Sequence, residues 1–101
     1  MIYNLPLNSG STYQRFTAEL SGRVLRFELR WLYQYEFFAV DIYEGETAIT
    51  QGRGLHPGIN LVEGLLTGLG AIYLEGDSPT VDNLGVDNKL RYDDAGAGDG
   101  S

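Results

Sequence analysis

The sequence predicts an all-β protein, a small antiparallel β-sandwich or barrel of six to eight short strands with at most one or two short helical turns. Apolar and polar residues alternate with a period of two through much of the first half, as half-buried strands require. Aromatic residues make up 12% of the chain and glycine contributes 14 residues, against three prolines, which is typical of strands joined by tight turns. At 101 residues the chain has room for one core, so we expect a single β domain over residues 1–92.

The clearest strands lie on either side of Ser21-Gly22. One face of each is apolar, and these residues are Phe16, Ala18 and Leu20 before the dipeptide and Leu25, Phe27, Leu29 and Trp31 after it. The charged residues Arg26, Glu28 and Arg30 alternate with the second set, which indicates an antiparallel strand with one solvated face. Because glycine takes the positive φ that primed turns need, Ser21-Gly22 predicts a hairpin turn.

The next strand follows a change of parity. Its apolar positions are Phe38, Val40 and Ile42. These are even-numbered, whereas those of the preceding strand are odd-numbered, so a turn or bulge must lie between Leu32 and Glu36. Glu44-Gly45 closes the strand, and residues 47–52 predict a further short strand with Ile49 facing inward.

The alternation breaks after Gly54, where Pro57-Gly58 cannot sit in a central strand. We expect residues 59–66 to be irregular or briefly helical. The composition of residues 71–75 and 89–92 predicts two more strands.

A short turn is predicted between these last two strands. Asp77 or Ser78 would cap it, and Pro79 would begin it, because the missing N–H costs nothing there. Leu84-Gly85 would end it. Residues 93–101 contain no large apolar group, so we expect a flexible, acidic, glycine-rich tail.

Charge and cysteine content argue against several classes of function. Asp and Glu outnumber Lys and Arg by 14 to 7, for a net charge of −7. Such a surface repels phosphate, so we expect neither nucleic acid nor a membrane as a partner. The absence of cysteine removes disulfides, thiolate zinc sites and cysteine nucleophiles. The first residues show neither a signal-peptide pattern nor a membrane span, and we expect synthesis in the cytoplasm.

No catalytic arrangement is visible, so we predict that the chain is not an enzyme and has no catalytic residues, cofactor or metal. His56 is the only histidine and has no acidic neighbour in the sequence, which favours a satisfied loop histidine over a general base. A serine hydrolase would need a Gly-x-Ser-x-Gly elbow, which does not occur. A paired-carboxylate glycosidase would need two acids from distant strands to meet across a cleft, and nothing in the sequence favours it.

One group of acidic and amide residues suggests calcium, namely Asp77, Asp82, Asn83, Asp87 and Asn88. The segment lacks the register and the final Glu of an EF-hand loop. Asp and Asn side chains commonly bond to their own backbone in turns, so we interpret these residues as turn residues.

A series of short segments follows in order along nearly the whole chain. It runs Arg30-Trp31, Asp41-Ile42-Tyr43, Gly54-Leu55, Pro57-Gly58-Ile59-Asn60-Leu61, Ser78-Pro79-Thr80-Val81-Asp82-Asn83-Leu84-Gly85 and Leu90-Arg91-Tyr92. This order resembles the phage baseplate plug family, and Pro-Thr-Val-Asp-Asn-Leu-Gly is its most specific element. Members carry a polar, glycine-bearing turn after the Arg-Trp position, whereas residues 32–36 here are aromatic and contain no glycine.

The resemblance implies a small β-rich structural protein of the central baseplate in contractile-tailed phages and prophages. It implies synthesis in the bacterial cytoplasm, a location in the virion tail, and other baseplate or tail-tube proteins as partners. A ring-like homo-oligomer and a place in a mixed hub are both open. The family has no catalytic residues to transfer.

The densest aromatic group supplies the candidate binding residues, which are Trp31, Tyr33, Tyr35, Phe37 and Tyr43. Aromatic side chains anchor protein partners because they bury much area at small entropic cost. Trp31 continues the inward parity of its strand, which favours core packing. Tyr33 and Tyr35 lie on the predicted turn, where core and interface are equally open.

Two functions therefore compete. The first is a structural component of a contractile-tail baseplate that acts through protein–protein contacts at the central hub. The alternative is a small carbohydrate- or ligand-binding β-module, in which Trp31 and the tyrosines stack on sugar rings. Exposure of Trp31 distinguishes the two, because a buried indole offers no platform to a sugar.

Overall fold

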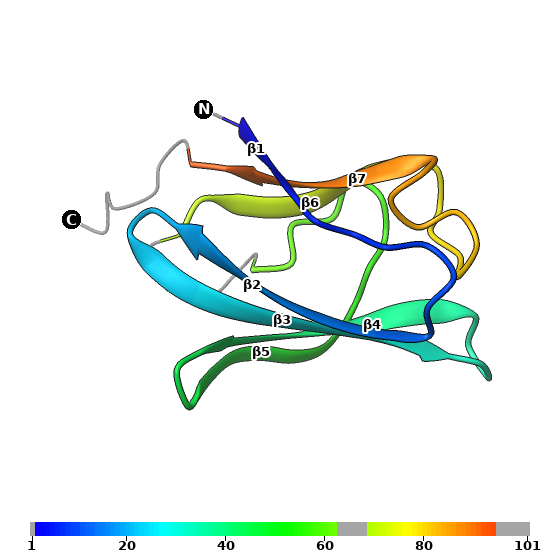
Figure 1. Ribbon diagram of the computed structural model, residues 1–101, viewed down its shortest axis with the longest axis horizontal. Helices are drawn as coiled ribbons and strands as arrows, with labels where there is room; N and C mark the ends of the chain where they lie inside the picture. Colours follow the sequence, from blue (N-terminus) through cyan, green and yellow to red (C-terminus); the bar gives the residue numbers. More distant parts are fainter. Residues whose placement is uncertain (1, 63–68, 95–101) are drawn as a thin grey trace.

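The computed structural model describes residues 2–62 and 69–94, which form a sandwich of two antiparallel sheets (Figure 1). The strands are β1 (Ile2–Leu5), β2 (Tyr13–Leu20), β3 (Arg23–Leu32), β4 (Phe37–Glu44), β5 (Thr47–Gly54), β6 (Ala71–Gly76) and β7 (Asn88–Asp93). One sheet has the order β1-β7-β6 and the other the order β2-β3-β4-β5. The predicted all-β fold is confirmed, as a sandwich and not as a closed barrel.

The four-stranded sheet is a run of consecutive hairpins. Phe16 lies opposite Phe27 across β2 and β3, and Leu29 lies opposite Val40 across β3 and β4. The apolar face of β3 is buried as the alternation predicts. The β2–β3 turn has φ values of +53° at Ser21 and +78° at Gly22, as a two-residue primed turn requires.

The three-stranded sheet joins the two ends of the described chain. β7 is central and pairs with both β1 and β6, so that Tyr3 lies opposite Tyr92 and Leu74 lies opposite Leu90. β1 was not predicted from the sequence. Only Leu5 of its four residues is buried, so the segment is too short to show alternation, and it is a strand because β7 offers it a free edge.

The core lies between the sheets. Its fully buried side chains come from both sheets and from the connections, and they are Leu25, Phe27, Leu29, Phe38, Val40, Ile42, Leu55, Leu61, Ile72, Leu74, Leu84, Leu90 and Tyr92. The Phe16 and Phe27 rings stack with centroids 4.9 Å apart. Tyr92 also joins the sheets through a polar contact, because its hydroxyl shares a hydrogen bond of 2.7 Å with Ser21 Oγ in the β2–β3 turn.

The connection after β5 is irregular, as predicted for residues 59–66, over the part that the structure describes. Residues 63–66 lie outside that part. Asn60 fixes the segment, since its Oδ1 accepts hydrogen bonds from the backbone N–H groups of Val62 and Ile72 at 3.1 Å each. The N–H of Leu61 donates to the carbonyl of Ile72 at 2.7 Å, which ties the connection to β6.

The turn before β7 is present, but its predicted cap and end were wrong. The turn covers residues 81–87, and Thr80 caps it. Thr80 N–H donates to Asn83 Oδ1 at 2.7 Å, and Asn83 N–H donates to Thr80 Oγ1 at 3.2 Å. This reciprocal pair satisfies two backbone donors at once, which favours Thr80 over Asp77 or Ser78.

The turn continues beyond Leu84-Gly85, because the side chain of Asn88 forms hydrogen bonds with the backbone at both ends of the turn. Asn88 Oδ1 accepts from the N–H of Gly85 at 2.7 Å, and its Nδ2 donates to the carbonyl of Asp77 at 3.2 Å. The interpretation of Asn83 and Asn88 as turn residues is therefore confirmed.

The last strand is slightly longer than predicted. β7 includes Asp93, which lies opposite Ala71 and Ile2, so the predicted tail of residues 93–101 begins too early by at least that residue. Residues 95–101 lie outside the described part of the chain. Within residues 2–62 and 69–94 there is no helix long and apolar enough to cross a membrane.

Candidate protein-protein interface

The loop between β3 and β4, residues 33–36, is an ordered turn, and it is named the hairpin loop below. The N–H groups of Tyr35 and Glu36 both donate to the carbonyl of Leu32, at 3.1 and 2.7 Å. The exposed fraction is 74% for Tyr33 and 67% for Tyr35. Figure 1 shows the hairpin loop at the same end of the sandwich as the turn 81–87, on the right of the view. Two large aromatic side chains are thus presented to solvent on a defined backbone.

A shallow depression of about 290 Å³ lies beside the hairpin loop and is lined by Trp31, Leu32, Tyr33, Gln34 and Tyr35. Trp31 belongs to this lining. The indole is half-buried and meets the Phe38 ring edge-on, with centroids 5.0 Å apart. Trp31 therefore packs against the core, as its parity predicts, and still borders the surface that the tyrosines present.

A row of rings extends from the hairpin loop toward the start of the next connection. The Tyr35 and Phe37 centroids are 6.1 Å apart, and the Phe37 and His56 centroids are 5.4 Å apart. Gly54 makes room for this contact, because an added Cβ would lie 2.7 Å from His56 Nε2. His56 thus packs as a loop histidine, and its place beside the aromatic group was not predicted.

Tyr43 lies apart from the other four predicted binding residues. It is six positions from Phe37 along β4, which corresponds to about 20 Å of extended chain. Its ring lies under the Arg26 guanidinium, whose carbon is 4.5 Å from the ring centroid, and its hydroxyl accepts a hydrogen bond of 2.9 Å from Gln51 Nε2. The structure places Trp31, Tyr33 and Tyr35 around one depression and brings Phe37 against Tyr35, whereas Tyr43 lies farther along the outer face of the four-stranded sheet.

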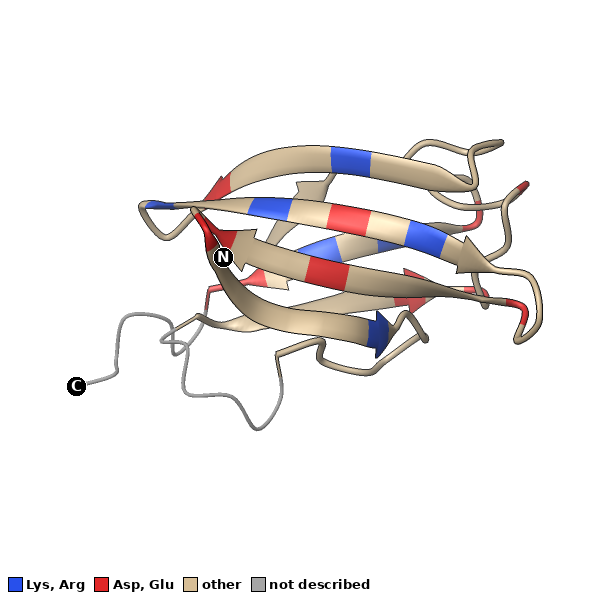
Figure 2. Ribbon diagram, turned by 90° about the horizontal axis from the view of Figure 1, so that it is seen from below, with Lys and Arg blue, Asp and Glu red and all other residues tan. Residues whose placement is uncertain are grey.

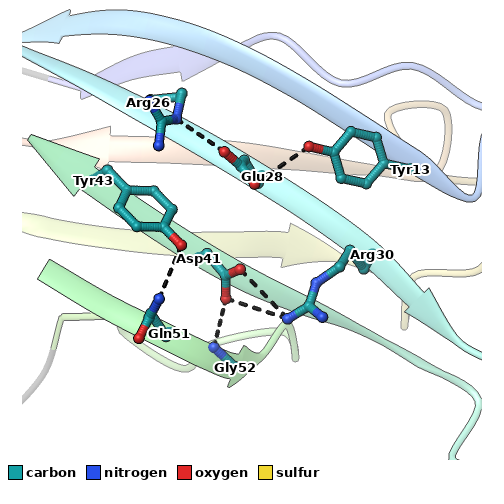
Figure 3. Close-up of polar contacts among 8 residues, drawn as sticks. All are labelled: Tyr13, Arg26, Glu28, Arg30, Asp41, Tyr43, Gln51 and Gly52. Atoms are coloured by element: carbon teal, nitrogen blue, oxygen red, sulfur yellow. Dashed lines mark hydrogen bonds and ion pairs between the residues drawn. The ribbon is translucent and has the colours of Figure 1, made fainter. Parts of the chain in front are cut away.

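That outer face carries a network of polar contacts that the sequence did not predict (Figure 3). Arg26 Nε donates to Glu28 at 2.9 Å, and the Tyr13 hydroxyl donates to the other oxygen of Glu28 at 3.3 Å. The sequence signal was the alternation of charges along β3, which indicated only a solvated face. The cross-strand partner Tyr13 depends on the register between β2 and β3.

Asp41 is the second centre of this network. Although charged, it is buried, with 7% of the residue exposed. The N–H of Gly52 donates to its Oδ1 at 2.7 Å, and Arg30 approaches its carboxylate at 3.4 Å. Gly52 has a φ of +68° and sits where the β4–β5 register shifts, so the carboxylate holds a β-bulge in place.

The strained residue of the hairpin loop yields a test of its backbone. Glu36 has a φ of +55°, which is costly for a residue with a Cβ and free for glycine. We expect Glu36→Gly to raise the free energy of unfolding by about 0.5 to 1 kcal/mol in urea titrations. Glu46→Gly is the control, because Glu46 lies in the β4–β5 turn without a positive φ and should lose stability. Equal losses in both variants would contradict the role of backbone strain.

Within residues 2–62 and 69–94, no three His, Asp or Glu side chains gather as metal ligands. A second shallow depression of about 340 Å³ lies over β6 and β7 and is lined by Glu75, Gly76, Val86, Asp87, Asn88, Lys89 and Arg91. Arg91 Nε forms an ion pair with Glu75, so two of the charges in this depression neutralise each other.

The fold and these surfaces define a class of protein: a small antiparallel β-sandwich with an exposed aromatic loop at one end and an ordered polar face on one sheet. The chain belongs to the family of the cyanophage baseplate Pam3 plug gp18, whose model matches residues 2–95. The resemblance noted in the sequence is therefore confirmed, and the family assigns the chain a structural role in a phage baseplate, within the virion tail. A search of the curated proteins found no match.

Proposed function

We propose that this chain is a structural component of a phage or prophage contractile-tail baseplate that binds its neighbours through protein–protein contacts at the central hub. The hairpin loop, with Trp31 and Phe37 behind it, supplies one of these contacts. The exposure of Tyr33 and Tyr35 on an ordered turn carries this proposal, since rigid exposed aromatics lose little entropy when they enter a partner's pocket.

The partners in this proposal are other baseplate or tail-tube proteins, and a homo-oligomer is included because assemblies of this kind are commonly symmetric. The family match supports a structural component and not an enzyme. The proposed role needs no cofactor. The net charge of −7 argues against nucleic acid and anionic membranes as partners. Synthesis in the bacterial cytoplasm precedes incorporation into the tail.

The carbohydrate-binding alternative would need an open indole face. Trp31 is half-buried, and its ring meets Phe38 edge-on at a centroid distance of 5.0 Å. That packing supports the structural proposal over a sugar platform, because stacking on a sugar requires a flat and accessible ring.

The test is incorporation into tails by a phage or prophage that carries Tyr33→Ser together with Tyr35→Ser. We expect a loss of roughly tenfold or more in the amount of the chain in purified tails, measured by quantitative mass spectrometry, because paired aromatic hot spots dominate interface affinity. The control is Val24→Thr, which changes an exposed apolar residue at the far end of β3 and should leave incorporation unchanged.

Two results would count against the proposal. If the double variant folds with a wild-type melting temperature and enters tails at wild-type levels, the hairpin loop is not a contact. If the wild-type chain is absent from purified tails, the baseplate role itself is rejected.

A further inference from the structure

We propose that the outer face of the four-stranded sheet is a second docking surface, which binds an acidic segment of a protein partner through its arginines. This surface is named the arginine face and consists of Arg15, Arg26 and Arg30 with the rings of Tyr13 and Tyr43. It is separate from the hairpin loop, so either proposal can fail while the other stands.

The register of the sheet brings the three arginines onto one face. Arg15 of β2 lies opposite Glu28 of β3, so Arg15 shares a face with Arg26 and Arg30, which flank Glu28 at alternate positions. Figure 2 shows this side of the sheet, with basic positions on β2 and β3 next to acidic positions on β3 and β4. Three of the seven basic residues of the chain therefore lie on this face.

Two of the three acids on this face, Glu28 and Asp41, are more shielded than the arginines beside them. The side chains of Glu28 and Asp41 are 19% and 10% exposed, whereas those of Arg26 and Arg30 are 38% and 48% exposed. A partner that approaches the face therefore meets guanidinium groups first, although the whole chain carries a net charge of −7. Electrostatic complementarity then favours carboxylates on the partner.

The acidic end of the sheet bounds the arginine face. Glu19 is exposed on the same face, next to the β2–β3 turn. Glu44 lies at the same end and is held by Arg23, which donates two hydrogen bonds to it at 3.0 and 2.6 Å. These bonds lower the pKa of the Glu44 carboxyl and raise the pKa of Arg23. Arg23 is therefore engaged in an ion pair within the chain and is not counted in the arginine face. The exposed guanidinium groups therefore lie away from this end, toward Tyr13 and Arg30.

The guanidinium groups are already oriented. Arg26 uses Nε to bind Glu28 and lies 4.5 Å above the Tyr43 ring, and its two terminal nitrogens have no hydrogen-bond partner among the described residues. Arg30 contacts Asp41 through one terminal nitrogen only, at 3.4 and 3.5 Å (Figure 3). Groups held this way lose little entropy when they bind, and the planar fork matches a carboxylate in a bidentate geometry.

The spacing defines the partner further. Arg26 and Arg30 are four residues apart on one strand, which places them about 13 Å apart. A partner that engages both needs carboxylates at a similar separation, as on a short acidic strand or on a helix about two to three turns long. Nucleic acid fits this spacing less well, because its phosphates follow one another every few ångströms along a strand, whereas the two arginines lie about 13 Å apart.

The test uses a fluorescein-labelled peptide of eight glutamates as the probe, with the full chain at low ionic strength. We expect measurable binding by fluorescence anisotropy that weakens as salt is added. Arg26→Gln with Arg30→Gln should weaken it about tenfold or more, because charge-assisted contacts are lost. Lys89→Gln with Arg91→Gln is the matched control, since it removes the same charge from the other sheet and should change affinity less than about twofold.

The conservative pair Arg26→Lys and Arg30→Lys keeps the charge but lacks the fork, and we expect an intermediate loss of about threefold. This pair also tests the idea if the Gln variant does not fold. Absence of binding by the wild-type chain, or equal losses in the Gln pair and its control, would overturn the proposal. So would tighter binding of an eight-residue thymidine oligonucleotide, or self-association of the chain that the Gln pair abolishes.

Discussion

Replacing Tyr92 with alanine should lower the free energy of unfolding by about 3 to 5 kcal/mol, the range for losing a fully buried aromatic side chain. Tyr92 lies on the central strand of the three-stranded sheet and has no exposed surface. Its hydroxyl shares a hydrogen bond with Ser21 Oγ and accepts another from the N–H of Gly70 at 3.3 Å. The variant loses core packing and the polar contact between the sheets together, and urea titration of the purified protein measures the loss.

A matched pair separates these two contributions. Tyr92→Phe keeps the ring and removes the hydroxyl, so we expect a loss of about 1 to 3 kcal/mol, because the buried hydroxyl's hydrogen bonds with Ser21 and Gly70 are lost. Tyr3→Phe makes the same change on the stacked neighbour, whose ring centroid is 6.2 Å away and whose residue is 43% exposed. Its effect should stay within about 0.5 kcal/mol. Equal effects of the two Phe variants would contradict a role for the buried hydroxyl.

Asn88→Ala should cost roughly 2 to 4 kcal/mol, because it removes three hydrogen bonds made by a buried amide. Asn88 is 3% exposed. Its amide accepts from Gly85 N–H and donates to the carbonyl of Asp77 and, at 3.2 Å, to Asn83 Oδ1. These bonds hold both ends of the turn 81–87, so hydrogen exchange of the Gly85 amide should also accelerate.

The control for this change is Asn4→Ala. Asn4 lies exposed on β1, and its Oδ1 accepts one hydrogen bond of 3.2 Å from Arg91. We expect a loss within about 0.5 kcal/mol, as for other surface substitutions. If Asn88→Ala is equally mild and leaves exchange of Gly85 unchanged, the amide does not organise the turn.

Much of the fold follows from local alternation. The odd-numbered apolar residues of β3 and the even-numbered ones of β4 were enough to predict both strands and the turn between Leu32 and Glu36. β1 was missed because its pairing with β7 is a contact between distant segments, which no local pattern reports. The cap at Thr80 was missed because the prediction took Pro79 as the first residue of the turn and placed the cap before it. In the structure the hydrogen bonds between Thr80 and Asn83 set the start of the turn.

The candidate site was predicted in part. The inward position of Trp31 follows from its parity, whereas the sequence left Tyr33 and Tyr35 equally open between core and interface, and the structure shows both exposed. The separation of Tyr43 depends on the length and straightness of β4, and its contact with Arg26 depends on the β3–β4 register. Contacts of this kind depend on which strands pair and in which register, and the sequence does not give either directly.

The position of β7 has a consequence for biosynthesis. β7 is hydrogen-bonded to β1 on one side and to β6 on the other, and Ile2 is paired with Asp93. The ribosome makes this strand last among the seven described strands, so β1 and β6 have no common neighbour to pair with until translation has reached Asp93. A chain terminated before β7 lacks the central strand of the three-stranded sheet. Only chains whose synthesis has passed Asp93 can therefore complete the sandwich and enter an assembly.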